Sequence, residues 1–525
     1  MPHLFHELIY KAANCGAKSE ALISQQHRLD YLELAEQTQK LATGFIKIGI
    51  ARGERLAVYL EKRVEGVTAL FAASAAGGVF VPINPLLKAE QVSYILSDCN
   101  VRILVTSISR FNLLKSVLTN CHDLHTIIVI DDNVELPSVK GLNLIRWQEV
   151  IAEKASCYTH RTIDSDMAAI LYTSGSTGKP KGVVLSHRNL VTGAKSVSTY
   201  LKNNSDDRIL SVLPLSFDYG LSQLTTAFYV GATCVLMNYL LPRDIMDEVI
   251  KEDITGLAAV PPLWIQLSQL KWEGLTSLRY ITNSGGAMPK ATLDQLRGLF
   301  PKTSIFLMYG LTEAFRSTYL PPEEINKRPD SIGKAIPNVE VLVLREDGSQ
   351  CAPGEPGELV HRGPLVSMGY WNDVEKTSAC FRQLSPRQSG LTIPEIAVWS
   401  GDTVRTDEEG FLYFIGRRDD MIKTSGYRVS PTEIEEIIYS TELVAEVAAV
   451  GVPHPVLGQA IVVVVVPRQD VNLNADVLLS ACKQALPAYM LPALVDIRKH
   501  SLLRNPNGKI DRKSLANELQ HSFIN

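Results

Sequence analysis

The sequence is short of the features that mark several common classes of protein. Its eight cysteines are scattered over 525 residues and none forms a CxxC pair, so zinc-site spacing is missing and a reducing compartment, the cytoplasm, is expected. The net charge of −4 lacks the basic excess of nucleic-acid-binding proteins. No basic stretch followed by an unbroken apolar run begins the chain, so we expect no signal peptide.

Charged residues are also absent from residues 66–87, a stretch long enough to cross a membrane. The adjacent glycines Gly77 and Gly78, followed by Pro82, interrupt this stretch. We therefore expect a buried helix that stops at the two glycines and a short strand over residues 79–83. A membrane span is the alternative.

Helix and strand patterns alternate over most of the chain, whose 46% hydrophobic and 21% charged residues are typical of a globular protein. Helical spacing at residues 30–49 is followed by a strand pattern at 55–60. The same order recurs over residues 91–107, and a further strand is expected at 125–132. This alternation predicts layered α/β architecture, with two such subdomains in a large N-terminal domain.

The pattern changes twice in the second half of the chain. After about Asn338, short strands alternate with Gly and Pro turns, which predicts an antiparallel β region. A charged turn then leads into a helix that starts at Pro431, and two strands, a helix and a polar tail follow. We place the boundary at that turn, giving an N-terminal domain of residues 1–418 and a small mobile α/β C-terminal domain of residues 419–525.

Residues 173–182 read TSGSTGKPKG and lie between two apolar segments. Glycines let backbone N–H groups turn toward an anion, hydroxyls add donors and lysines supply charge, so the composition is typical of triphosphate binding. The spacing is not that of a Walker A loop, because only two residues separate Gly175 from Gly178 and a proline follows Lys179. A flexible surface turn is the alternative.

Further motifs accompany this loop. They are NSGGAMP (283–289), YGLTEA (309–314), SGD (400–402), GRRDDMIKTSGYRVSPTEIE (416–435) and NPNGKIDR (505–512). In this order the set resembles the adenylate-forming superfamily, which includes acyl-CoA synthetases, firefly luciferase and the adenylation domains of nonribosomal peptide synthetases. The resemblance covers nearly the whole chain.

The resemblance implies that a carboxylate attacks the α-phosphorus of ATP to give an acyl-adenylate and pyrophosphate. A carboxylate with a pKa of about 4 is ionised at neutral pH, so positioning and charge neutralisation suffice without a general base. By resemblance, Lys509 bridges the carboxylate and the α-phosphate, Thr312 contacts that phosphate and Glu313 binds Mg²⁺. The ATP-binding residues implied are Thr173, Ser174, Gly175, Ser176, Thr177, Gly178, Lys179, Gly285, Gly286, Ala287, Tyr309, Gly310, Asp402 and Arg417.

The resemblance also assigns parts of ATP and a movement. Tyr309 and the glycine loop before it would hold adenine, and Asp402 would accept from the ribose hydroxyls. Asp419 occupies the hinge position, about which the C-terminal domain would turn between the two half-reactions. Lys423 and Gly426 would then line the entry of a phosphopantetheine thiol, although for Lys423 a plain surface role is the alternative.

Four residues are candidates for binding the acid: Phe217, Asp218, Ser284 and Arg316. The Phe217–Asp218 pair resembles amino-acid adenylation domains, in which the aspartate meets the substrate ammonium, and departs from the Pro-Leu-Phe-His run of many acyl-CoA synthetases. A buried anion is costly without a cation, so Asp218 favours an amino or imino acid. Alternatively, Asp218 caps a turn. Arg316 could pair with Asp218 and remove this argument, meet a polar substrate group, or face solvent.

The acceptor is expected in trans, because a carrier domain needs about 70–100 residues and only thirteen follow Arg512. We expect delivery to the phosphopantetheine of a separate carrier protein, with proline as the first substrate to test and with neither nucleic acid nor membrane as partner. The alternative is an AMP-forming CoA ligase for a small or medium carboxylic acid. A luciferase-like oxidation and a non-catalytic nucleotide sensor are further alternatives.

Overall fold

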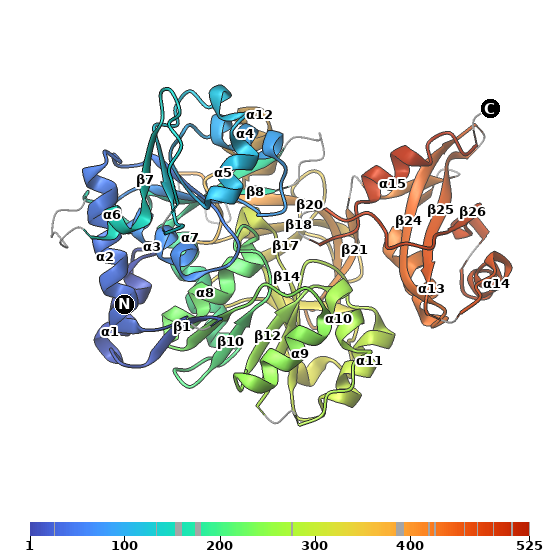
Figure 1. The fold of residues 1–525 in the computed structure, drawn as a ribbon. Helices are drawn as coiled ribbons and strands as arrows, with labels where there is room; N and C mark the ends of the chain where they lie inside the picture. The colour runs from blue at the N-terminus through green and yellow to red at the C-terminus, as the bar shows by residue number, and fades with distance from the viewer. Residues whose placement is uncertain are drawn as a thin grey trace.

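The structure is a computed structural model of the 525-residue chain. It describes all residues except 26, 133, 153–159, 174–179, 275–276, 385–392, 418–419, 425–426, 456, 470, 487, 506–507 and 524–525, together with the side chains of residues 423, 427, 428 and 489. Figure 1 shows helices and sheets of the large N-terminal domain beside a small C-terminal domain that contains the chain end.

The first sheet has the strand order β7-β6-β5-β3-β4-β8-β9, parallel except for the antiparallel pair β8–β9. Leu56 and Val58 on β3 belong to one hydrophobic core, whereas Ala57 and Tyr59 belong to another, so both faces of the sheet are covered. The strands are β3 (Arg55–Tyr59), β4 (Val79–Pro82), β5 (Val101–Thr106), β6 (Thr126–Val129), β7 (Asn143–Arg146), β8 (Met167–Thr173) and β9 (Lys181–Ser186). The helices along this part of the chain are α1 (Glu7–Cys15), α2 (Tyr31–Lys47), α3 (Val64–Ala75), α4 (Ala89–Asp98), α5 (Ile108–Leu114), α6 (Trp147–Ile151) and α7 (His187–Tyr200).

The charge-free stretch forms the helix and strand expected from its glycines. Helix α3 ends at Ala75, Gly77 adopts a φ of +77°, and β4 begins at Val79. Every residue of α3 from Gly66 onward is buried inside the domain. Of the helices that the structure describes, none is long and apolar enough to cross a membrane.

The second sheet contains fourteen strands among the described residues, in the order β17-β18-β20-β21-β16-β15-β14-β13-β12-β10-β11-β1-β2, with β19 paired to β20. Its strands β1, β11, β10, β12, β13 and β14 are parallel, and the rest pair antiparallel. The parallel part comprises β1 (Glu20–Ser24), β10 (Arg208–Ser211), β11 (Thr233–Leu236), β12 (Gly256–Ala259), β13 (Tyr280–Asn283) and β14 (Ser304–Tyr309), with β2 (His27–Asp30) antiparallel at the edge. The helices here are α8 (Asp218–Val230), α9 (Pro242–Lys251), α10 (Pro261–Leu267) and α11 (Lys290–Leu299).

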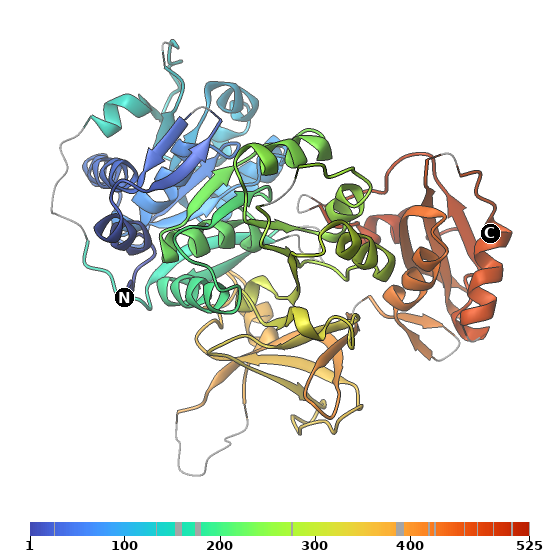
Figure 2. The ribbon, with the colours of Figure 1, turned by 90° about the horizontal axis from the view of Figure 1, so that it is seen from below.

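The antiparallel β region expected after Asn338 is present, but it is hydrogen-bonded to the α/β subdomain as one sheet. Strand β15 pairs with β14, and β16 joins β15 to β21. Figure 2 shows this region below the α/β layers. Its elements are β15 (Thr318–Leu320), β16 (Ser331–Ala335), β17 (Glu340–Leu344), β18 (Gly357–Arg362), α12 (Val374–Cys380), β19 (Phe381–Gln383), β20 (Ile396–Thr406) and β21 (Leu412–Arg417).

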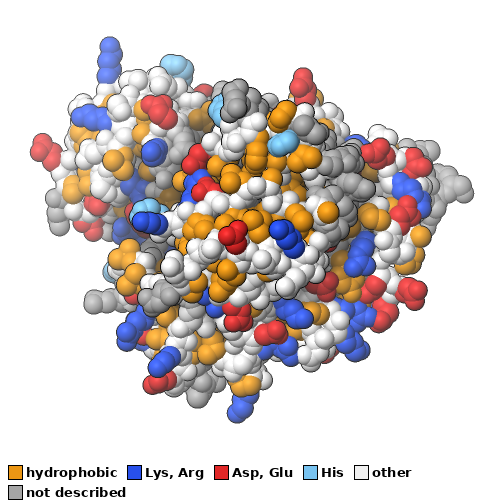
Figure 3. All heavy atoms as spheres, turned by 90° about the vertical axis from the view of Figure 1, so that its right-hand side faces the viewer, with side chains coloured by type: hydrophobic (Ala, Val, Ile, Leu, Met, Phe, Trp, Pro, Cys, Tyr) orange, Lys and Arg blue, Asp and Glu red, His pale blue; other side chains and the backbone are white. Residues whose placement is uncertain are grey.

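The C-terminal domain is a small mixed sheet with helices. Its elements are β22 (Ile422–Thr424), β23 (Tyr427–Val429), α13 (Pro431–Ser440), β24 (Val444–His454), β25 (Gly458–Pro467), α14 (Ala475–Ala485), β26 (Leu494–Ile497) and α15 (Arg512–Glu518). Helix α15 lies in the segment expected to be a polar tail; Asp511 caps it by accepting from the backbone of Ser514. Figure 3, which faces this side of the molecule, shows hydrophobic side chains intermixed with charges of both signs.

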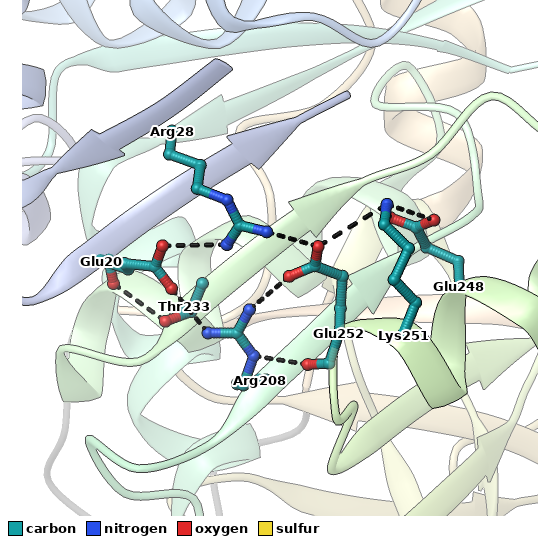
Figure 4. Close-up of polar contacts among 7 residues, drawn as sticks. All are labelled: Glu20, Arg28, Arg208, Thr233, Glu248, Lys251 and Glu252. Carbon is teal, nitrogen blue, oxygen red and sulfur yellow. Dashed lines mark hydrogen bonds and ion pairs between the residues drawn. The ribbon is translucent and has the colours of Figure 1, made fainter. Parts of the chain in front are cut away.

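Charged side chains form a network at the amino ends of the parallel strands (Figure 4). Glu252 is 4% exposed and accepts from Arg28 and Arg208, each at 2.6 Å. Glu20 accepts from the same two arginines at 2.9 and 2.8 Å. Because each buried charge is met by an opposite one, the network ties the β1–β2 hairpin to β10 and the end of α9.

Candidate active site

The candidate site lies where four adjacent parallel strands of the second sheet end. Strands β10, β12, β13 and β14 run parallel as neighbours. The segment after β10 leads to Phe217 and Asp218, Ser284 directly follows β13, and Thr312 lies just beyond β14. In open α/β sheets, ligands bind outside the carboxyl ends of the strands. The sheet topology therefore gathers motifs that lie far apart in the sequence.

The loop after β13 requires glycine. Gly285 has a φ of +83°, and a Cβ atom there would lie 3.2 Å from the Lys509 Cε. A Cβ on Gly286 would lie 3.2 Å from a ring carbon of Pro261. The Asn283 side chain donates to the Gly286 carbonyl at 3.1 Å and holds the turn. Gly286 and Ala287 are exposed, so their backbone is accessible to a ligand, and the approach of adenine to this loop stays a prediction.

Asp402 offers a buried acceptor on another side of the site. Its carboxylate accepts a hydrogen bond from the Tyr309 hydroxyl, and its Oδ1 lies 3.3 Å from Arg417 Nε. Within the described residues, Oδ1 has no hydrogen-bond partner of good geometry. Burial raises the pKa of Asp402, against the opposing effect of Arg417. Such an acceptor fits a ribose hydroxyl; packing of Tyr309 against adenine stays a prediction.

Glu313 is held by a residue that the sequence reasoning missed. The Tyr370 hydroxyl donates to Glu313 Oε1 at 2.5 Å, and the Ser367 N–H donates to the Glu313 carbonyl at 2.8 Å. Burial raises the pKa of Tyr370, so the hydroxyl remains a donor. In the described part of the chain, no group of three His, Cys, Asp or Glu could hold a metal alone. One carboxylate completed by phosphate oxygens suits Mg²⁺, so Glu313 fits the implied ion.

Lys509 brings a cation from the C-terminal domain to this site. Its Nζ lies 5.9 Å from the centroid of the Phe217 ring, and its Cε lies against Gly285. The side chain remains accessible to solvent although protein atoms of both domains surround it. These surroundings lower the pKa of Lys509 by desolvation, while Asp218 opposes the shift. The domains also touch where the Lys290 N–H donates to Glu436 at 3.0 Å.

Asp218 and Arg316 form a buried pair, with side chains 4% and 3% exposed. Arg316 Nη1 donates to Asp218 Oδ2 at 3.3 Å, and the Thr312 hydroxyl donates to Oδ1 at 3.4 Å, both long for hydrogen bonds. The capping interpretation of Asp218 is wrong, because Phe217 occupies the cap position of α8 without a side-chain bond. A solvent-facing Arg316 is excluded by its burial.

Some candidate residues lie outside the described part of the chain. These are Ser174, Gly175, Ser176, Thr177, Gly178, Lys179, Asp419 and Gly426. Thr173 is the last residue of β8, where it precedes the glycine-rich loop. Lys423 lies on β22 through its backbone. The roles of all of these residues therefore stay predictions.

Comparison with protein families and curated proteins gives a consistent result. The model of the AMP-binding enzyme family matches residues 9–371, and that of the AMP-binding enzyme C-terminal domain matches residues 433–509. An L-proline--[L-prolyl-carrier protein] ligase of Pseudomonas fluorescens is 30% identical, over 98% of this chain and 99% of its own. A long-chain-fatty-acid--CoA ligase of Salmonella typhimurium is 28% identical, over 99% and 95%.

Solved structures agree on the fold. An anthranilate CoA ligase in complex with anthranoyl-AMP superposes with a TM-score of 0.89 at 23% identity, covering 99% of this chain and 98% of that one. An o-succinylbenzoate coenzyme A synthetase of Bacillus subtilis, in complex with ATP and a magnesium ion, gives a TM-score of 0.82 at 26% identity, with 97% and 98% covered. The mixed α/β fold with a large and a small domain is confirmed.

Proposed function

Because the chain belongs to the AMP-binding enzyme family, we propose that it activates an amino or imino acid and passes the acyl group to a carrier-protein thiol. At the coarser level it is an adenylate-forming acid–thiol ligase that uses ATP. In the first step, an oxygen of the carboxylate bonds to the α-phosphorus and the bond to pyrophosphate breaks. In the second, the phosphopantetheine sulfur bonds to the acyl carbon and AMP leaves.

The position of Lys509 supports the first step. Two like-charged partners, a carboxylate and a triphosphate, must approach each other, so a cation between them lowers the barrier. Lys509 reaches Phe217 and Gly285 from the other domain, and the carboxylates of Asp218 and Asp402 interact with its charge. In this proposal Lys509 contacts the reacting oxygens, Thr312 the α-phosphate and Glu313 the magnesium ion that neutralises phosphate charge.

The remaining roles are proposed from the resemblance of the sequence motifs. Asp402 accepts from the ribose, Gly285 and Gly286 admit adenine, and the loop that begins at Thr173 holds the β- and γ-phosphates. Asp419 acts as the hinge, while Lys423 and Gly426 line the thiol entry after the domain turns. The reaction takes place in the cytoplasm, where carrier thiols stay reduced.

The incomplete pairing of the buried Asp218 is the observation that best supports an amino-acid substrate. Asp218 is 4% exposed and begins α8 in the site, and its side-chain hydrogen bonds from Arg316 and Thr312 are both long. Burial raises its pKa, so the anion is undercompensated, and a substrate ammonium would supply the missing charge. The prolyl-carrier ligase relative makes proline the first amino acid to test.

The Asp218–Arg316 contact favours one second candidate, an AMP-forming CoA ligase for a small or medium carboxylic acid. If Arg316 already neutralises Asp218, the pocket needs no cationic substrate. The fatty-acid CoA ligase relative, which aligns over a similar span, agrees with this alternative.

Exchange of labelled pyrophosphate into ATP, measured over a panel of acids, tests the proposal. We expect exchange with amino acids, and we expect Asp218→Asn to abolish it while sparing a des-amino analogue. Exchange confined to fatty or aryl acids would falsify the amino-acid assignment. The acceptor is tested by thioester formation with a phosphopantetheinylated prolyl-carrier protein and with CoA, each supplied at the same concentration. Preference for the carrier supports our proposal, whereas preference for CoA supports the alternative.

A further inference from the structure

Arg316 is left with unused hydrogen-bonding capacity at the base of the site. Its side chain is 3% exposed, and only Nη1 donates, to Asp218 at 3.3 Å. Nε and Nη2 are buried and have no acceptor in any part of the chain that the structure describes. A buried donor without a partner is destabilising, because it has lost its hydrogen bonds to water. These two donors would be satisfied in a ligand-bound state in which the ligand supplies their acceptors.

The two unused donors share one edge of the guanidinium. Nε–H and the outer Nη2–H of an arginine point the same way, and this edge matches the two oxygens of a carboxylate. The chain itself supplies a precedent: Arg279 uses this edge on Asp207, with Nε at 3.1 Å from Oδ1 and Nη2 at 2.6 Å from Oδ2. The free edge of Arg316 is therefore complementary to a carboxylate.

The surroundings fix where the guanidinium can go. It stacks on the Tyr219 ring, 4.6 Å from the centroid, and the centroid of the Phe315 ring lies 5.8 Å away. Phe315 has a φ of +55°, uncommon for a bulky residue, and its ring fills the space above Gly193. This strained turn positions Arg316 beside Asp218, on the carboxyl-end side of the sheet.

Charge also points to a second anion. The Asp218–Arg316 pair is neutral, so an ammonium that engages Asp218 would leave Arg316 as a buried cation with one weak contact. A carboxylate on the same substrate would restore neutrality and satisfy both free donors. Because Nε and Nη2 are enclosed in this structure, the guanidinium must turn away from Asp218 to reach that group. The Asp218–Arg316 pair would then be replaced by two pairs with the substrate, one between Asp218 and the ammonium and one between Arg316 and the carboxylate.

We infer that Arg316 binds a second carboxylate of the acid substrate, distinct from the carboxylate that is activated. The inference rests on the proposed function and deepens it: the substrate is an amino acid whose side chain ends in a carboxylate. Proline has no such group and would leave the free edge of Arg316 unpaired.

Pyrophosphate exchange with matched acids tests this inference. The panel pairs glutamate with glutamine and aspartate with asparagine, and adds proline, glutarate and succinate. We expect the intact chain to prefer an amino dicarboxylic acid over its amide by about 100-fold or more in kcat/KM, because a site with buried donors rejects a substrate that cannot fill them.

Variants of Arg316 assign that preference to this residue. Arg316→Lys keeps the charge but loses the two-donor edge, and Arg316→Gln loses both. We expect Arg316→Gln to lower kcat/KM for the dicarboxylic acid about 100-fold, with little change for the amide, and Arg316→Lys to fall between. Since Arg316→Gln strands Asp218, thermal unfolding of this variant and of the double variant with Asp218→Asn shows whether the single variant is still folded. Arg243→Gln, on an exposed face of α9, should leave the preference unchanged.

The outcomes separate this inference from the proposed function. Exchange with proline or another neutral amino acid, unaltered in Arg316→Gln, would overturn the second-carboxylate site and leave amino-acid activation standing. Exchange with succinate or glutarate, lost in Arg316→Gln, would support the site and overturn the amino-acid assignment. Exchange with glutamate or aspartate, lost in the same variant, supports both.

Discussion

Two ion pairs, each with a buried aspartate, lie at opposite ends of the parallel strands. Asp207 and Arg279 directly precede β10 and β13, whereas Asp218 and Arg316 follow β10 and β14. The two aspartates are equally enclosed, with exposures of 3% and 4%. Asp207 accepts from Arg279 at 3.1 and 2.6 Å and from Thr255 at 2.7 Å, whereas Asp218 accepts from Arg316 at 3.3 Å and from Thr312 at 3.4 Å.

The pKa values of these carboxylates move in opposite directions. Burial alone would raise the pKa of both. At Asp207 the hydrogen bonds, led by Arg279, outweigh burial and the pKa is lowered. At Asp218 burial outweighs Arg316 and the pKa is raised. Asp207, at the amino ends of the strands, is therefore stabilised as an anion by its partners. Asp218, at the carboxyl ends, is incompletely paired, as expected where a ligand completes the pairing.

Substitution of one lysine at each of the two sites should give the largest difference in adenylation rate. We expect Lys509→Ala to lower the adenylation rate about 100- to 1,000-fold, the usual loss when one group that stabilises transition-state charge is deleted. ATP binding should be nearly retained, as measured by equilibrium titration with ATP. Lys251→Ala, in the amino-end network, removes ion pairs to Glu248 and Glu252 and is the matched control. Equal loss in both variants would contradict the division of roles.

Amide substitutions at the two aspartates compare stability directly. Asp207→Asn should lower the free energy of unfolding by about 2 kcal/mol, because it weakens the charged hydrogen bonds of a buried carboxylate, while Arg279, 37% exposed, keeps part of its hydration. Asp218→Asn alone would leave the buried Arg316 without a counter-charge, so the matched change is the double variant with Arg316→Gln. This double variant should lower the free energy of unfolding by less than about 1 kcal/mol, because both charges are removed together and their contact is long. Urea denaturation followed by circular dichroism measures both variants, and a larger loss in the double variant would mean that the Asp218–Arg316 pair is structural.

The dependence of stability on acid pH should also differ between Asp207 and Asp218. The folded pKa of Asp207 is lowered, so its stabilisation is complete above the unfolded value of about 3.8 and is lost as the pH falls through the folded pKa. The folded pKa of Asp218 is raised, so its ionised form costs stability at neutral pH and protonation relieves that cost as the pH falls through the raised value. Asp207→Asn should therefore flatten the loss of stability below about pH 4, whereas Asp218→Asn should leave that loss in place.

The sequence predicts several single elements, because their signals are local. Helical spacing at residues 30–49 and the two glycines after α3 identify a helix start and a helix end without any distant contact. The resemblance of the ordered motifs to a known family likewise predicts Glu313 and Lys509 as site residues. By contrast, the sequence predicts a polar tail where α15 lies, because this short, mostly polar segment lacks a clear apolar stripe.

Long-range pairing is the part that could not be predicted. Arg279 binds Asp207 across 72 residues, and Arg316 meets Asp218 across 98. No period or spacing encodes such contacts; they arise only when parallel strands align their ends. For the same reason, the sequence leaves three alternatives open for the contacts of Arg316. The hydrogen bonding of the antiparallel region to β14 could not be predicted from the sequence either.

Substitution of Tyr370 should have the smallest effect of these changes, because Tyr370 contacts the Glu313 carboxylate but carries no charge itself. Its hydroxyl donates to Glu313 at 2.5 Å, and orienting bonds of this kind to metal ligands are worth about 10-fold or more in metal affinity. We expect Tyr370→Phe to raise the Mg²⁺ concentration needed for half-maximal exchange about 10-fold, while the rate at saturating Mg²⁺ and the unfolding transition stay nearly unchanged. Tyr413→Phe, which deletes a 3.0 Å bond to Asp407 away from the site, is the matched control. An unchanged Mg²⁺ requirement in Tyr370→Phe would remove Tyr370 as a positioning residue for Glu313.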